Sequence, residues 1–100
     1  MAFNKAHKFA RADQQRALLC KALSHPARIV MIRQLMEHDT LRASVLGHAV
    51  PLSQPATSQH LQLLHQTGLV ERKEEYPNVY YRMAPELPDW KQRILLAVVQ

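Results

Sequence analysis

The segment from Ser53 to Gly68, SQPATSQHLQLLHQTG, carries both a start signal and a stop signal for a helix. Ser53 is a residue type that accepts hydrogen bonds from the free amides of a first helical turn, and Pro55 stands where its missing N–H costs nothing. Gly68 is the residue type that closes a helix in a left-handed conformation. These signals predict a helix from about residue 54 to Thr67 with both of its ends fixed.

The chain before this helix predicts three more helices. Residues 5–23 contain few helix breakers, and the sequence LSHPAR repeats the start signal, with Ser24 as the expected cap of a second helix that runs to about Glu37. Residues 41–50 predict a short third helix, although Gly47 weakens its middle. A short helix, a tight turn and a second, capped helix together predict a helix-turn-helix unit.

After Gly68 the pattern changes from helical spacing to alternation. The runs LVERKEE and VYYRM favour β-strands, and YPN between them predicts a hairpin. Pro85 and Pro88 then bracket the start of a last helix at about residues 87–99. The predicted fold is mainly α with a small β-hairpin, a winged helix-turn-helix of four helices, two strands and a fifth helix, in a single domain over residues 1–100.

Charge is distributed unevenly along this fold. The net charge is +5, yet residues 43–70 contain no Asp, Glu, Lys or Arg. Helical spacing turns Leu61 and Leu64 toward the core and leaves Gln59 and Gln62 on the outer face. Exposed helices usually carry Glu and Lys, whereas Gln can pair with the major-groove edge of adenine. This uncharged face is typical of a helix that reads DNA bases while cations elsewhere meet the phosphates.

Three stretches of the sequence resemble a known family. ALSHPARIVMIRQLM, LSQPATSQHLQLLHQTGLVERKEE and VYYRM, within about residues 18–84, are similar to the ArsR/SmtB-type winged-helix repressors of bacteria. The resemblance implies a homodimer that is built from the first and last helices, binds palindromic operator DNA and leaves it when an inducer, often a metal ion, is bound. It places on the recognition segment Ser53, Gln54, Thr57, Ser58, Gln59, His60 and Gln62, and on the wing Arg72, Lys73, Tyr80 and Arg82.

Different roles are expected within these sets. Contacts to bases are expected from Gln54, Ser58, Gln59 and Gln62, and contacts that position the DNA backbone from Ser53 and Thr57. Contacts to phosphates are expected from Arg28, Arg42, Arg72, Lys73 and Arg82. The wing departs from the family, because its tip, EEYPNV, is acidic. The histidines are interpreted as surface or hydrogen-bonding residues. An alternative hypothesis is that a proton on His60 adds charge to the recognition helix, so that DNA affinity rises as the pH falls.

The last helix predicts a homodimer. Its sequence ILLAVV is apolar around most of its circumference, which is more than one buried stripe on a monomer requires. Leu95, Leu96 and Val99 are expected to need cover from a partner, together with the first helix. Two-fold symmetry would place two reading helices about one DNA turn apart. The expected interface residues are Phe9, Leu19, Trp90, Ile94, Leu95, Val98 and Val99.

Metal and cofactor sites are not expected. The resemblance implies inducer sites made of Cys pairs near the third helix, or of Asp and His on the last helix. Residues 38–50 contain no Cys and the last helix contains no His, so neither donor set is complete. We interpret Cys20 as a small, buried apolar residue. No apolar run approaches the roughly 18 residues of a membrane span, and a single Cys fits a reducing compartment, so a cytoplasmic location is expected.

Two alternatives to DNA reading follow from the same features. A winged helix that acts as a protein-interaction module without specific DNA binding would also have an uncharged helix face and an acidic wing tip. An enzyme is not expected, because the sequence has no Gly-rich phosphate loop and no nucleophile with a recognisable base.

Overall fold

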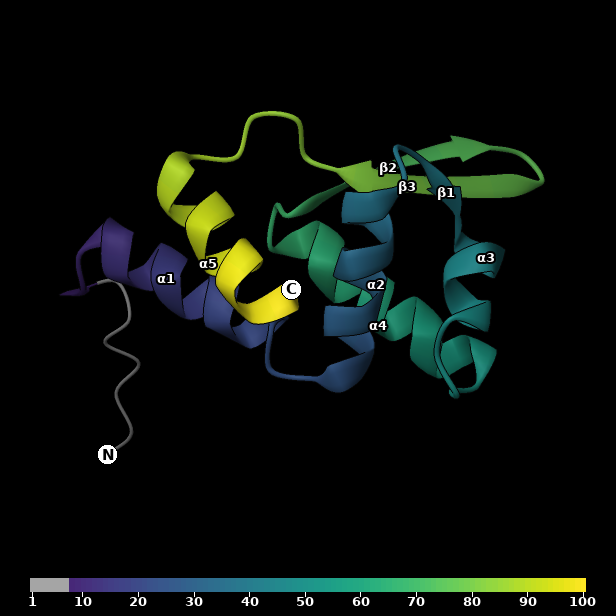
Figure 1. The fold of residues 1–100 in the computed structure, drawn as a ribbon, viewed down its shortest axis with the longest axis horizontal. Coiled ribbons are helices and arrows are strands. Elements are labelled where there is room, and N and C mark those ends of the chain that lie inside the picture. Colours follow the sequence, from purple (N-terminus) through teal and green to yellow (C-terminus); the bar gives the residue numbers. More distant parts are fainter. Residues whose placement is uncertain (1–7) are drawn as a thin grey trace.

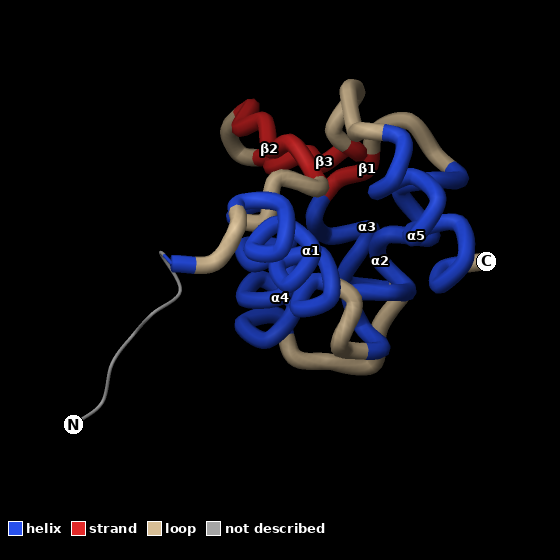
Figure 2. Tube along the Cα trace, turned by 90° about the vertical axis from the view of Figure 1, so that its left-hand side faces the viewer, coloured by secondary structure: helices blue, strands red, loops and turns tan. Residues whose placement is uncertain are grey.

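Five helices and a three-stranded sheet make up residues 8–100, the part of the chain that the computed structural model describes (Figure 1). The elements are α1 (Arg11–Ala22), α2 (Pro26–Glu37), β1 (Leu41–Arg42), α3 (Ala43–His48), α4 (Gln54–Gln66), β2 (Val70–Glu75), β3 (Asn78–Met83) and α5 (Asp89–Val99). The strands lie along one edge of the group of helices in two perpendicular views (Figure 1 and Figure 2). The predicted order of helices, hairpin and closing helix is confirmed, with one strand added.

The two outer helices begin later than predicted. α1 begins at Arg11, because Ala10 has the extended angles φ −57° and ψ 141°. The prediction that this helix covers residues 5–23 was therefore wrong for residues 8–10, and residues 5–7 lie outside the described part. α5 begins at Asp89 after an extended Pro88, within two residues of its predicted start. Neither helix has a capping side chain. Because a capping residue is the sequence signal that marks where a helix begins, the starts of these two helices were predicted less accurately.

The cap of α2 is His25 and not Ser24. Nδ1 of His25 accepts a hydrogen bond from the amide of Ala27 at 3.0 Å. Since Pro26 is already the first helical residue, the cap is the residue immediately before it. The Ser24 hydroxyl instead donates to the carbonyl oxygen of Lys21 at 2.7 Å and closes the end of α1.

The sheet has a third strand that the sequence did not predict. Leu41 and Arg42, which were expected to begin the third helix, pair antiparallel with Tyr81 and Tyr80 of β3. The strand order is β1-β3-β2, and the predicted hairpin of β2 and β3 is confirmed. β1 ties the helix-turn-helix unit to the hairpin, since α3 begins immediately after Arg42.

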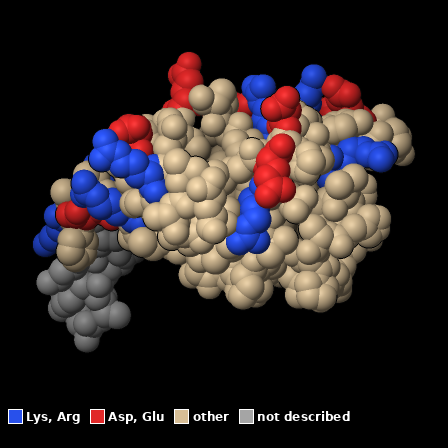
Figure 3. All heavy atoms as spheres, in the orientation of Figure 1, with Lys and Arg blue, Asp and Glu red and all other residues tan. Residues whose placement is uncertain are grey.

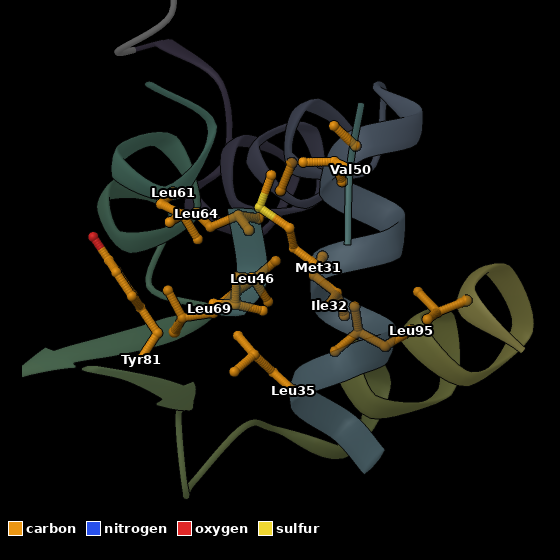
Figure 4. Close-up of a cluster of buried hydrophobic side chains, with 14 of the residues drawn as sticks. Met31, Ile32, Leu35, Leu46, Val50, Leu61, Leu64, Leu69, Tyr81 and Leu95 are labelled. Carbon is orange, nitrogen blue, oxygen red and sulfur yellow. The ribbon is translucent and has the colours of Figure 1, made fainter. Parts of the chain in front are cut away.

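The core lies where α2, α3, α4 and α5 meet the sheet (Figure 4). Met31 and Ile32 of α2, Leu46 of α3 and Leu64 of α4 have no exposed surface. Burying one such side chain stabilises the fold by about 1.5 to 3 kcal/mol. Because α3 and α4 both contribute to this core, packing fixes how α4 is presented on the surface.

Candidate nucleic-acid interface

The start of α4 is held by its own cap. Ser53 Oγ accepts a hydrogen bond from the amide of Ala56 at 3.3 Å. The Ser53 carbonyl accepts from the amide of Thr57 at 2.9 Å and from its hydroxyl at 3.0 Å. Thr57 is only 5% exposed, so its side chain belongs to the core and fixes the first turn. Gly68 has φ +81°, the left-handed conformation predicted for the residue that closes this helix.

The outer face of α4 is polar, uncharged and exposed. Gln54, Ser58, Gln59 and Gln62 are all exposed, while Leu61 on the opposite side is buried. The predicted division of this helix into a core face and an outer face is therefore confirmed. The corner of the molecule that α3 and α4 form shows no Lys, Arg, Asp or Glu (Figure 3, lower right). The polar side chains of this face can donate and accept hydrogen bonds, and they lie in a region of the visible surface that has no charged residues.

His60 lies at the side of this face and not on it. It is half-buried, and its Nδ1 is 2.7 Å from Nη1 of Arg28. Arg28 is only 8% exposed, and its other guanidinium nitrogens donate to Ala22, Lys21 and Ser24. The prediction that Arg28 contacts phosphate was wrong, because its donors are used inside the chain.

The predicted cations of the wing divide between the two faces of the sheet. Residues directly opposite each other in paired strands share a face. Arg42, Tyr80 and Lys73 form one such cross-strand row, and Arg82 lies on the same face two residues along from Tyr80. Arg72 is paired with the buried Tyr81 and so points to the other face. The structure brings Arg42 of β1 together with two wing cations, Lys73 and Arg82, and separates the third wing cation, Arg72, from them.

Each of the three wing cations has an acidic partner. Arg72 pairs with Glu74, Lys73 with Glu75 at 2.9 Å, and Arg82 with Glu71 at 2.7 Å. Exposed ion pairs of this kind contribute about 0 to 1 kcal/mol, so a phosphate can replace the carboxylate at little cost. Arg42, by contrast, has no ion pair within residues 8–100. The wing therefore adds little net positive charge.

The predicted dimer residues fall into three groups by their exposure. Leu19, Leu95 and Val99 are at most 2% exposed within one chain, so the expectation that Leu95 and Val99 need cover from a partner was wrong. Trp90 and Ile94 are half-buried. Phe9 and Val98 remain exposed. They are joined by two further exposed apolar residues on α1 and α5, Leu18 and Leu96.

Cys20 is exposed, contrary to its interpretation as a buried residue. Within residues 8–100, no three His, Cys, Asp or Glu side chains lie close enough to hold a metal ion together. In the same part of the chain, every helix is too short or too polar to cross a membrane.

Known proteins share both this sequence pattern and this arrangement. Residues 25–72, from the cap of α2 into β2, match the family described as bacterial regulatory protein, arsR family. The arsenic resistance transcriptional regulator ArsR1 of Pseudomonas putida is 34% identical over 82 residues, which are 82% of this chain and 64% of that protein. This chain thus spans less than two thirds of the length of that relative. The HTH-type transcriptional regulator YgaV of Escherichia coli is 35% identical over 77 residues, which are 77% of each protein.

A solved structure agrees over almost the whole chain. The homodimeric winged helix-turn-helix DNA-binding domain Mb0332 of Mycobacterium bovis, a possible ArsR-family transcriptional regulator, aligns with a TM-score of 0.72 and 28% identity. The alignment covers 98% of this chain and 86% of that domain. The predicted winged helix-turn-helix fold is confirmed by this likeness.

Proposed function

Since this chain belongs to the arsR family of bacterial regulatory proteins, we propose that it is a homodimeric transcriptional repressor that reads an inverted repeat of DNA with α4. The family is one of transcriptional regulators and not of enzymes. The observation that carries the proposal is the outer face of α4. It is exposed, uncharged and rich in Gln and Ser, and its helix is capped and packed so that this face is presented outward.

We propose that one surface provides sequence specificity and that other surfaces bind the DNA phosphates. Gln54, Ser58, Gln59 and Gln62 have side chains suited to base edges in the major groove. The phosphates are held by the free amides at the start of α4 and by a basic row of Arg42, Lys73 and Arg82 on one face of the sheet. Tyr80 lies within this row and has a hydroxyl that can donate to phosphate. Because two of the three cations must leave an acidic partner, we expect the wing to contribute modestly.

The homodimer is supported by exposed apolar surface and by the solved relative. Phe9, Leu18, Leu96 and Val98 are each at least 45% exposed, although they are large and apolar. All four come from α1, from the residues before it, or from α5, and the Mycobacterium bovis domain is described as homodimeric. A two-fold axis through this surface would relate the two copies of α4 by symmetry, and such a pair of helices fits an inverted repeat in DNA.

We also propose that the protein lacks the family's usual metal-sensing sites. Residues 38–50 have no Cys and α5 has no His, so the donor sets that the resemblance implies are incomplete. We place the protein in the bacterial cytoplasm, where its operator would lie.

Selection from random DNA duplexes by the purified protein tests the proposal. We expect the selected pool to converge on an inverted repeat, and binding to the selected duplex to exceed binding to a scrambled one by about a thousandfold or more. A scrambled sequence bound equally well, or no binding to duplex DNA, would instead favour the protein-interaction module. That alternative is supported by the ion pairs that the wing cations form with glutamates of the same hairpin, because these pairs reduce the charge available to phosphates.

A further inference from the structure

The guanidinium of Arg28 connects three segments of the chain behind α4. Its Nε donates to the carbonyl oxygen of Ala22 at 2.9 Å, and its Nη2 donates to the carbonyl oxygen of Lys21 at 3.0 Å and to Oγ of Ser24 at 3.1 Å. Its Nη1 makes the 2.7 Å contact with Nδ1 of His60. Arg28 therefore joins the end of α1, the turn before α2 and the middle of α4.

The contact with Arg28 determines which nitrogen of His60 carries a proton. A guanidinium has donors but no acceptor, so Nδ1 of His60 must accept, and the neutral ring then holds its proton on Nε2. A second proton on Nδ1 would turn this hydrogen bond into a contact between two donors and two positive charges at 2.7 Å. The link between α2 and α4 therefore exists only while His60 is neutral.

No acidic group around His60 offsets such a charge. His25 of α2 lies against it, with ring centroids 4.2 Å apart, and Arg28 lies on the same side. α4 supplies no carboxylate, since residues 43–70 contain no Asp or Glu, and the end of α1 brings the cation Lys21. Among the described residues, no carboxylate bonds to Arg28, His25 or His60. Burial first, and then the charges of His25 and Arg28, lower the pKa of His60 below its ordinary value of 6.5.

We propose that Arg28 is a positioning residue which, through neutral His60, holds α4 in the orientation that reads DNA, and that a proton on His60 opens this link. The proposal rests on α4 being the reading helix. Its direction is opposite to the hypothesis drawn from the sequence, in which a charged His60 strengthens DNA binding. Because the folded chain disfavours the charged ring, the link is complete above about pH 6.5 and is lost as the pH falls through the lower pKa of the folded state.

Nitrogen NMR of the histidine rings in the DNA-free protein tests the link itself. At about pH 7.5 we expect His60 to be the neutral tautomer with its proton on Nε2, and to take up its second proton below about pH 6.5. A proton on Nδ1 in the neutral ring, or titration at or above the ordinary value, would overturn the proposal. This measurement needs no operator and no variant.

Operator affinity as a function of pH tests the consequence for DNA. The variant His60→Gln keeps a carbonyl oxygen that can accept from Arg28 but does not titrate. At constant salt, between about pH 7.5 and about pH 5.5, we expect the unsubstituted protein to lose about tenfold in operator affinity, and His60→Gln about twofold or less. His65→Gln is the matched control, because His65 is exposed on the same helix and should keep the unsubstituted protein's pH profile.

The outcomes separate this proposal from the proposed function. Equal pH profiles for the unsubstituted protein and His60→Gln would overturn the role of the link in DNA reading. If the protein selects no operator at about pH 7.5, the proposed function fails, and the role of the link in DNA reading fails with it. The tautomer measurement would then still decide whether the link exists.

Discussion

At the scale of single residues, sequence patterns identified side chains whose contacts are with residues only a few positions away. Ser53 caps α4 through an amide only three residues ahead of it, so the sequence alone contains the signal. Arg28 and His60 meet across 32 positions, and no local pattern records such a contact. Cys20 was wrongly expected to be buried, because the buried residues of α1 are Leu19 and Ala22 and Cys20 lies outside this narrow stripe. The residue types of a helix do not show how many of its positions are buried against the core.

Two serines of α4 separate stability from DNA reading. Ser53→Ala removes the cap, so we expect the free energy of unfolding to fall by about 1 kcal/mol. Ser58→Ala changes the exposed outer face, so stability should stay within about 0.5 kcal/mol while operator affinity falls. Urea unfolding followed by circular dichroism measures the first effect, and fluorescence anisotropy measures the second. Equal loss of stability in both variants would contradict the assigned roles.

At the scale of elements, helices with capping signals were predicted within about a residue, and α4 is the clearest case. β1 was missed, because two residues are too short to show alternation and its partner, β3, comes nearly 40 positions later. The wing was predicted as a hairpin, but its one cross-strand ion pair among the described residues, Arg82 with Glu71, depends on the register of β2 with β3. That register, and not the composition, decides that Arg82 lies opposite Glu71, whereas Arg72 and Lys73 face opposite ways simply because they are consecutive residues of one strand.

The wing is expected to hold DNA without reading it. Arg82→Ala should weaken binding to the operator and to a scrambled duplex alike, and it should reduce the slope of log affinity against log salt by about one. Arg93→Ala is the control, because Arg93 also has an exposed acidic partner, Asp89 at 2.6 Å, but lies on α5. Titrations at several salt concentrations measure both slopes. A loss confined to the operator would contradict a phosphate contact by Arg82.

At the scale of the whole molecule, the sequence pointed to α1 and α5 for the proposed dimer, but two of the predicted interface residues on α5 are buried within one chain. α5 packs its Leu95 and Val99 into the chain's own core, and Arg33 Nε donates to the Val99 carbonyl at 2.8 Å. The face with Leu96 and Val98 is thereby turned outward. Periodicity identifies an apolar helix, but which side faces a partner depends on how the helix docks on α2.

A charge on this outward face should separate the proposed dimer. Val98 is 45% exposed, so Val98→Asp is tolerated by a folded monomer, whereas burying the carboxylate between two subunits costs about 2 kcal/mol or more. We expect a monomeric mass by sedimentation at a concentration where the unsubstituted chain is dimeric. Val45→Asp is the control, since Val45 on α3 is 39% exposed and lies on a different helix. An unchanged dimer in Val98→Asp would exclude this face.

We propose that α4 reads the DNA sequence without charge while cations elsewhere hold the phosphates. The most direct test is the salt dependence of operator binding by the unsubstituted protein and by Gln59→Ala, with Gln66→Ala at the end of α4 as the control. We predict parallel lines of log affinity against log salt, with Gln59→Ala weaker by about 1 to 3 kcal/mol at every salt concentration and Gln66→Ala unchanged. A different slope for Gln59→Ala, or an equal loss on the operator and on scrambled DNA, would contradict the claim.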